Sequence, residues 1–189
     1  IVYKYGMDTA LMKYSVQKEG KERNKYITVI IGSQLITGIL FTIILYGTRL
    51  HSAEYILGLN RPDWITYLAV ILFFDSLWSL PMLILRSEER PMPFIIFSLL
   101  NVILTMALNI LFVVHWGQGI EGVFKANIIA SGVIFFSSVP IIIKRIDLGS
   151  FEKEIFITVF KFAIPFLPAG IFTMIMELSD RYILEFYLG

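Results

Sequence analysis

Long apolar runs separated by short polar connections dominate the sequence. Five runs come close to the roughly 20 residues that a helix needs to cross a bilayer. An earlier apolar stretch, residues 1–16, has the pattern of the end of a helix whose start is missing. We therefore expect one partial and five full transmembrane helices. The five full runs are residues 26–48, 65–85, 92–116, 126–143 and 155–176.

The lengths of the runs and of their connections define the fold class. The runs are too long for buried strands, and they lack the alternation of a membrane β-barrel. Short connections make consecutive helices antiparallel. Residues 49–63 are predicted to form a longer loop, and residues 86–91 a tight turn with Pro91 at the start of the next helix. The sequence thus predicts an all-α polytopic membrane protein.

Composition agrees with a membrane environment. The 189 residues are 57% hydrophobic and 16% charged, with a mean hydropathy of +0.75. Soluble domains average about 45–50% apolar and about 25% charged residues. The formal net charge of +1 points to no nucleic-acid partner, and the lack of cysteine excludes disulfides and thiolate metal sites.

The distribution of Lys and Arg predicts the orientation. Positively charged residues concentrate on the cytoplasmic side of membrane proteins. One set of alternate connections carries nearly all of them, so we expect this set to be cytoplasmic. It holds Lys18, Lys21, Arg23, Lys25, Arg86, Arg90, Lys144, Arg145 and Lys153, whereas the other set holds Arg49, Arg61 and Lys125.

Several polar residues fall at membrane depth. Asp75 lies about 16–18 Å from either end of its run at 1.5 Å per residue, too far to reach water by extending its side chain. It is either a proton, cation or substrate site or a structural carboxylate paired with a neighbouring helix. A polar stripe in the next run either lines a cavity or bonds to another helix. The stripe consists of Ser98, Asn101, Thr105 and Asn109.

Two charged pairs have the i,i+4 spacing that allows intrahelical pairing. Lys4 and Asp8 form the first pair, and a functional role and a place near the interface remain open for it. Glu121 and Lys125 form the second, and Lys125 is either a functional cation or an interface residue.

The last run contains helix breakers and a charged end. Pro165 and Pro168 remove helix donors and invite a kink, and Gly170 adds local freedom, so we expect a hinge. Asp180 and Arg181 follow; they are either functional or a structural pair.

Motifs for catalysis or cofactor binding are missing from the sequence. Residues 117–122 read as GxGxxG, but they join two membrane runs and do not follow a strand, so they do not predict dinucleotide binding. We expect no enzyme activity, no cofactor and no metal.

The order of several motifs resembles one transporter family. Residues 5–11 (YGMDTAL) resemble the second-helix motif of polysaccharide flippases, and residues 85–90 (LRSEER) their turn between helices four and five. Residues 119–124 (GIEGVF) are similar to their entry into helix six. Residues 162–170 (FAIPFLPAG) and 178–184 (LSDRYIL) look like helix seven. The chain resembles the Wzx-like polysaccharide transporter (O-antigen flippase) branch of the multidrug/oligosaccharidyl-lipid/polysaccharide exporter superfamily, from late helix two through helix seven.

The resemblance implies a partial MATE-like bundle. Residues 1–150 would form the N-lobe, without its first helix, and residues 151–189 the first helix of the C-lobe. Members of this class flip undecaprenyl-diphosphate-linked oligosaccharide across the bacterial cytoplasmic membrane by alternating access. The implied partners are that substrate, membrane lipids and other polysaccharide-assembly proteins.

The cargo chemistry indicates roles for the polar residues. A diphosphate requires cations, and a sugar requires amide and hydroxyl groups. Candidate coupling carboxylates are Asp8 and Asp75. The candidate cations are Lys4, Lys125 and Arg181, and the candidate sugar contacts are Asn101, Thr105 and Asn109. The alternatives are a multidrug cation antiporter or a lipid II flippase of the same superfamily, a membrane enzyme, and a non-transporting scaffold.

Overall fold

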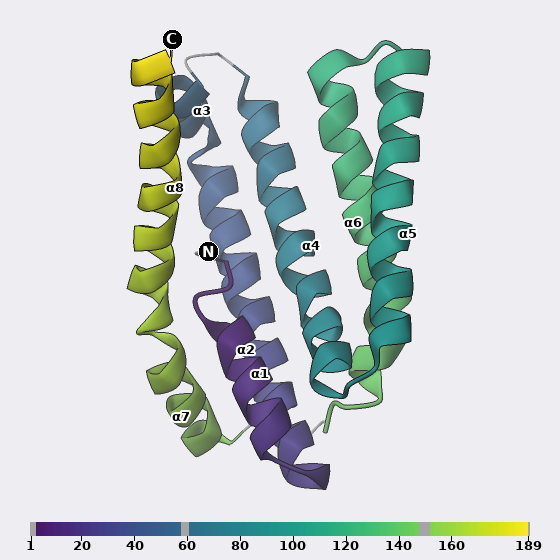
Figure 1. Ribbon diagram of the computed structural model, residues 1–189, viewed down its shortest axis with the longest axis vertical. Coiled ribbons are helices and arrows are strands. Elements are labelled where there is room, and N and C mark those ends of the chain that lie inside the picture. The colour runs from purple at the N-terminus through teal and green to yellow at the C-terminus, as the bar shows by residue number, and fades with distance from the viewer. Residues whose placement is uncertain (1–2, 58–60, 148–151, 189) are drawn as a thin grey trace.

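The computed structural model is a bundle of long helices (Figure 1). It describes residues 3–57, 61–147 and 152–188, with the side chains at 54–57, 178 and 181–188 left out. Every regular element within these ranges is a helix, which confirms the predicted all-α class. The elements are α1 (Met7–Gln17), α2 (Gly20–Gly47), α3 (Arg49–Leu57), α4 (Pro62–Ser87), α5 (Pro91–Asn109), the π-helix η1 (Ile110–His115), α6 (Gly119–Ile143), α7 (Lys153–Ala163) and α8 (Phe166–Leu188).

The predicted spans are confirmed. Among the described residues, five helical segments are long and apolar enough to cross a membrane, and each overlaps one predicted run. The chain is therefore a multi-pass membrane protein. Pro62 and Pro91 open α4 and α5, where proline's missing N–H is tolerated. The segments are Gly20–Gly47, Pro62–Ser87, Pro91–His115, Gly119–Ile143 and Lys153–Glu177.

The segment after α2 differs from its prediction. Residues 49–63 were expected to form a loop, but the first part of that segment is the helix α3. Ala53 on α3 is only 1% exposed, and α3 contacts both α2 and α4. Packing against two long helices stabilises a short helix that its own polar sequence does not predict.

Residues 3–6 form turns and not a helix, so the prediction of a helix end over residues 1–16 is wrong for these residues. Gly6 has a φ of +81°, and α1 begins only at Met7. A Cβ atom on Gly6 would lie 2.4 Å from the carbonyl oxygen of Ala163. Glycine at this position therefore permits both the turn and the close approach of the end of α7.

The main buried cluster joins α1, α2, α4 and α7. Met7 and Leu11 on α1, Ile30 on α2, Leu80 on α4 and Val159 on α7 are all fully buried within it. A buried polar bond adds to the packing between α2 and α4, because the Gln34 amide donates to the Ser76 carbonyl oxygen at 2.7 Å.

The outer helices are much less covered. In Figure 1, α8 lies at one side of the bundle, and α5 and α6 lie at the other, with α2 and α4 between them. None of the residues of α5 is buried. Large apolar side chains are exposed along α5 and α8, for example Ile96, Ile103 and Phe172. Such faces suit contact with lipid or with other protein segments.

Candidate functional site

A polar cavity opens between the start of the chain and helices α4, α5 and α6. Its volume is about 810 Å³. Apolar residues such as Leu83 and Phe94 share its lining with many polar ones. The polar and charged residues that line it are Lys4, Asp8, Asp75, Ser79, Arg86, Ser98, Asn101, Thr105, Asn109, Asn127 and Ser131.

The stripe on α5 forms one wall of this cavity. Ser98, Asn101, Thr105 and Asn109 recur every three or four residues, which places them on one face of the helix. The side-chain oxygen of Asn101 is buried and has no hydrogen-bond partner within the described part of the chain. An unpaired buried carbonyl oxygen is unfavourable in an apolar setting. Asn101 lines the cavity, but this oxygen is itself covered by protein atoms.

Asp75 lies on the α4 side, within reach of α6. Its Oδ1 atom accepts a hydrogen bond from the Ser131 hydroxyl at 2.6 Å and another from the Trp78 indole at 3.2 Å. The carboxylate therefore has a partner on a neighbouring helix and also faces the cavity. The two alternatives that the sequence left open, a structural carboxylate and a site residue, are compatible in this geometry.

Lys4 and Asp8 line the cavity without pairing with each other. The expected i,i+4 pair is wrong: among the described ion pairs none joins them, because Lys4 lies before the turn at Gly6 and not on the helix. Asp8 is in the first turn of α1 and accepts a hydrogen bond from the Thr9 backbone N–H at 2.9 Å. Both charged residues are part of the cavity lining.

A second cavity of about 460 Å³ adjoins the first. Lys4 and Asp8 line both cavities. The opposite wall comes from the beginning of α8 and includes Gly170 and Thr173. The helix break between α7 and α8 falls at residues 164–165, which includes Pro165. Pro165 and Pro168 do not line either cavity. The hinge role of Pro165, Pro168 and Gly170 remains a prediction.

Two other predicted residues, Lys125 and Asp180, do not line this site. Lys125 donates to the Gln118 side chain at 3.0 Å, and Glu121 pairs with Arg61 at 3.5 Å. The expected Glu121–Lys125 pair is therefore wrong, because each side chain finds a partner outside its own helical turn. Asp180 is exposed on α8, outside the cavity linings. The side chain of Arg181 lies outside the described residues.

Sequence reasoning missed four cavity residues that carry hydrogen-bonding groups. Asn127 and Ser131 are one turn apart on α6, the same signal that identified the stripe on α5. Trp78 lies three residues after Asp75 and donates to it. Arg86 was interpreted only as part of a polar turn, although it lines the cavity at the end of α4.

The lining combines groups that suit a polar, charged ligand. Amides and hydroxyls can exchange hydrogen bonds with a hydroxyl-rich molecule, and Lys4 and Arg86 can bind an anion. Within residues 3–57, 61–147 and 152–188, no group of three or more His, Cys, Asp or Glu side chains could hold a metal ion.

Comparison with known proteins identifies a family. A scan against protein families matches residues 1–189, the whole chain, to the family described as polysaccharide biosynthesis protein. A search of the curated proteins and a search of the solved structures found no match.

Proposed function

This chain belongs to the polysaccharide biosynthesis protein family, and from that premise we propose that it is part of a flippase for lipid-linked oligosaccharide. The proposed cargo is an undecaprenyl-diphosphate-linked sugar, moved across the bacterial cytoplasmic membrane by alternating access. The observation that supports the proposal most is the polar cavity between spanning helices. Polar and charged side chains between spanning helices are costly in lipid, and they commonly mark a substrate or ion pathway.

The lining is matched to the two chemical parts of such a cargo. The sugar would occupy the part of the cavity lined by Asn101, Thr105 and Asn109, whose amide and hydroxyl groups can exchange hydrogen bonds with sugar hydroxyls. The diphosphate would interact with Lys4 and Arg86, because cations bind phosphate oxygens. The lipid tail would remain in the bilayer, so a closed pocket is unnecessary.

Two carboxylates supply the groups for energy coupling. Asp8 and Asp75 both line the cavity, and a carboxylate at membrane depth can bind a proton or a cation. We propose that their occupation is coupled to the movement of the cargo. Other polysaccharide-assembly proteins are proposed as partners that supply and receive it.

The lobe division follows the same proposal. Residues 1–150 would form the N-lobe and residues 151–189 the first helix of the C-lobe. The second cavity is lined by residues of both parts, with Lys4 and Asp8 from the first and Gly170 from the second. Movement of α8 about Pro165, Pro168 and Gly170 would then change access to Lys4 and Asp8.

A transport assay tests the proposal. The complete transporter of which this chain is proposed to be a part is reconstituted into vesicles that carry a fluorescent undecaprenyl-diphosphate oligosaccharide, and the fraction reaching the opposite leaflet is measured with an impermeant quencher. We expect Asp75→Asn to slow flipping by about tenfold or more, whereas Asp63→Asn, an exposed carboxylate on the same helix, should leave it within about twofold. Wild-type vesicles that flip no more cargo than empty vesicles would overturn the proposal.

The carboxylates also permit a second candidate function. Asp8 and Asp75 could bind an organic cation, as a multidrug cation antiporter of the same superfamily would. The amide and hydroxyl groups of the lining suit a sugar-bearing cargo, whereas apolar residues such as Leu83 and Phe94 also suit an organic cation. Competition between the fluorescent oligosaccharide and either an organic cation or lipid II in the same vesicles distinguishes the three cargoes.

A further inference from the structure

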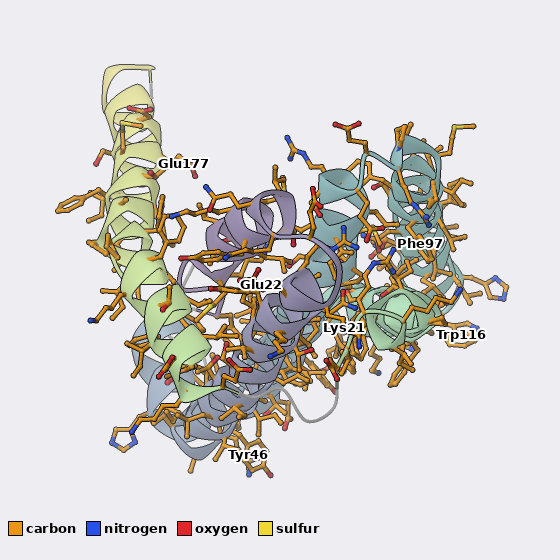
Figure 2. The ribbon with its side chains drawn as sticks, turned by 90° about the horizontal axis from the view of Figure 1, so that it is seen from below. Lys21, Glu22, Tyr46, Phe97, Trp116 and Glu177 are labelled. Carbon is orange, nitrogen blue, oxygen red and sulfur yellow. The ribbon has the colours of Figure 1, made fainter. Side chains whose placement is uncertain are left out.

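A second charged region lies at the end of the bundle where α2 begins and where α4 and α6 end. A pocket of about 560 Å³ occurs there, at the end that the Lys and Arg distribution predicts to be cytoplasmic. Figure 2 views the molecule from this end, with Lys21 and Glu22 marking the start of α2. The pocket is lined by Arg23, Asn24, Glu88, Arg90, Lys144 and Arg145.

The charges in this pocket do not balance. Its lining contains four cations and a single carboxylate, Glu88. Arg145 donates hydrogen bonds from its Nε and Nη2 atoms to both oxygens of that carboxylate. It also donates from Nη1 to the Ile141 carbonyl oxygen at 2.7 Å. Glu88 and Arg145 thus satisfy each other, and both side chains are only 10–12% exposed.

The other cations are left with weak partners. Arg23 and Arg90 approach Glu88 only to 3.6 Å and 3.8 Å, beyond hydrogen-bond length. The Nε atom of Arg23 is buried and has no hydrogen-bond partner among the described residues. Lys144 is exposed at the pocket.

Among the described ion pairs, no carboxylate other than Glu88 pairs with Arg23, Arg90 or Lys144, and neither Glu89 nor Asp147 forms one. Glu22 pairs with Lys18 at 2.6 Å, and Glu152 pairs with Lys25 at 2.6 Å. Both pairs lie outside this pocket. A further anion is therefore the simplest group that would neutralise Arg23, Arg90 and Lys144 together.

We propose that this pocket binds a phosphate-bearing anion through Arg23, Arg90 and Lys144. Guanidinium groups match the oxygens of phosphate in a forked geometry. Basic pockets between spanning helices on the cytoplasmic side suit the headgroups of anionic lipids. Inorganic phosphate offers the same chemistry. The site is separate from the cavity of the proposed function and does not depend on which cargo is carried, because the two linings have no residue in common.

Binding to the purified protein in an uncharged detergent tests this site. Phosphatidylglycerol and inorganic phosphate are titrated separately, and the midpoint of thermal unfolding reports binding. The pocket variant Arg23→Gln/Lys144→Gln removes two cations and leaves the Glu88–Arg145 pair intact. Whichever probe stabilises the wild type should bind this variant with an affinity about tenfold lower, because charge-assisted hydrogen bonds are lost.

The control Lys21→Gln/Lys153→Gln removes the same charge from the same end but outside the pocket. It should change the affinity by no more than about twofold. An equal loss in the control, or no stabilisation of the wild type by either probe, would overturn the proposal. If the double variant does not fold, Lys144→Gln alone is compared with Lys21→Gln on the same criterion.

The two probes also identify the source of the phosphate. Stabilisation by phosphatidylglycerol but not by inorganic phosphate supports a lipid headgroup as the ligand. Stabilisation by inorganic phosphate alone supports a free anion. Stabilisation by each probe alone, with the loss of both in the pocket variant, supports recognition of the phosphate group itself, whichever molecule carries it.

Discussion

Helices α4 and α5 are joined by one tight turn, and both are long and apolar enough to span a membrane. Their surroundings nevertheless differ. Helix α4 packs against α1, α2 and α6 and buries residues from Ile65 to Leu85. Helix α5 contributes no buried residue, and its polar stripe lines the cavity. Hydropathy thus identifies a spanning helix but not what covers each of its faces.

The largest difference between the two helices should appear in stability. Leu80 on α4 is fully buried, and Leu99 on α5 is 56% exposed. We expect Leu80→Ala to lower the free energy of unfolding by about 2–5 kcal/mol, because it leaves a cavity among packed helices. Leu99→Ala, the matched change on α5, should alter it by no more than about 0.5 kcal/mol. Unfolding in mixed micelles measures both, and equal losses would mean that α5 is as tightly packed as α4.

A smaller effect is expected at the turn between these helices. Arg145 donates hydrogen bonds to the Glu88 carboxylate, and this interaction holds the pKa of Glu88 below its ordinary value of 4.5. Glu88→Gln should lower the free energy of unfolding at neutral pH by about 1.5–3 kcal/mol, the range for hydrogen bonds to charged groups. Unfolding of the two proteins under the same conditions measures the difference.

The pH dependence supplies the control for Glu88. A carboxylate whose pKa is lower in the folded state stabilises the protein above its unfolded pKa, and that stabilisation is lost as pH falls through the folded pKa. The wild type should therefore lose more stability than Glu88→Gln between about pH 6 and pH 3. Parallel pH profiles for the two proteins would show that the Arg145–Glu88 interaction contributes nothing to stability.

The sequence predicted the helices more fully than their contacts. Long apolar runs fix the spans because a bilayer demands about 20 apolar residues. The stripe from Ser98 to Asn109 was also visible, because helical spacing is local. The start of α1 was not visible in the sequence, because it depends on the close approach of Gly6 to the Ala163 carbonyl, which is far away in sequence.

Pairing of charges shows the same limit. The i,i+4 rule predicted Glu121–Lys125, but Arg61 and Gln118 are the actual partners. The hydroxyl of Ser131 reaches Asp75 across 56 residues of sequence. A single sequence gives spacing along a helix, whereas partners on another helix depend on how the helices pack.

The most direct test of the account asks whether one face of α5 lines a wet cavity. The sequence has no cysteine, so single cysteines can be placed freely and labelled with a membrane-impermeant maleimide. We predict that Thr105→Cys and Asn109→Cys, on the cavity wall, are labelled in intact membranes. Ile103→Cys, exposed on α5 outside the cavity, should stay unlabelled because it faces lipid. Equal labelling of all three, or labelling of Ile103→Cys alone, would contradict the account.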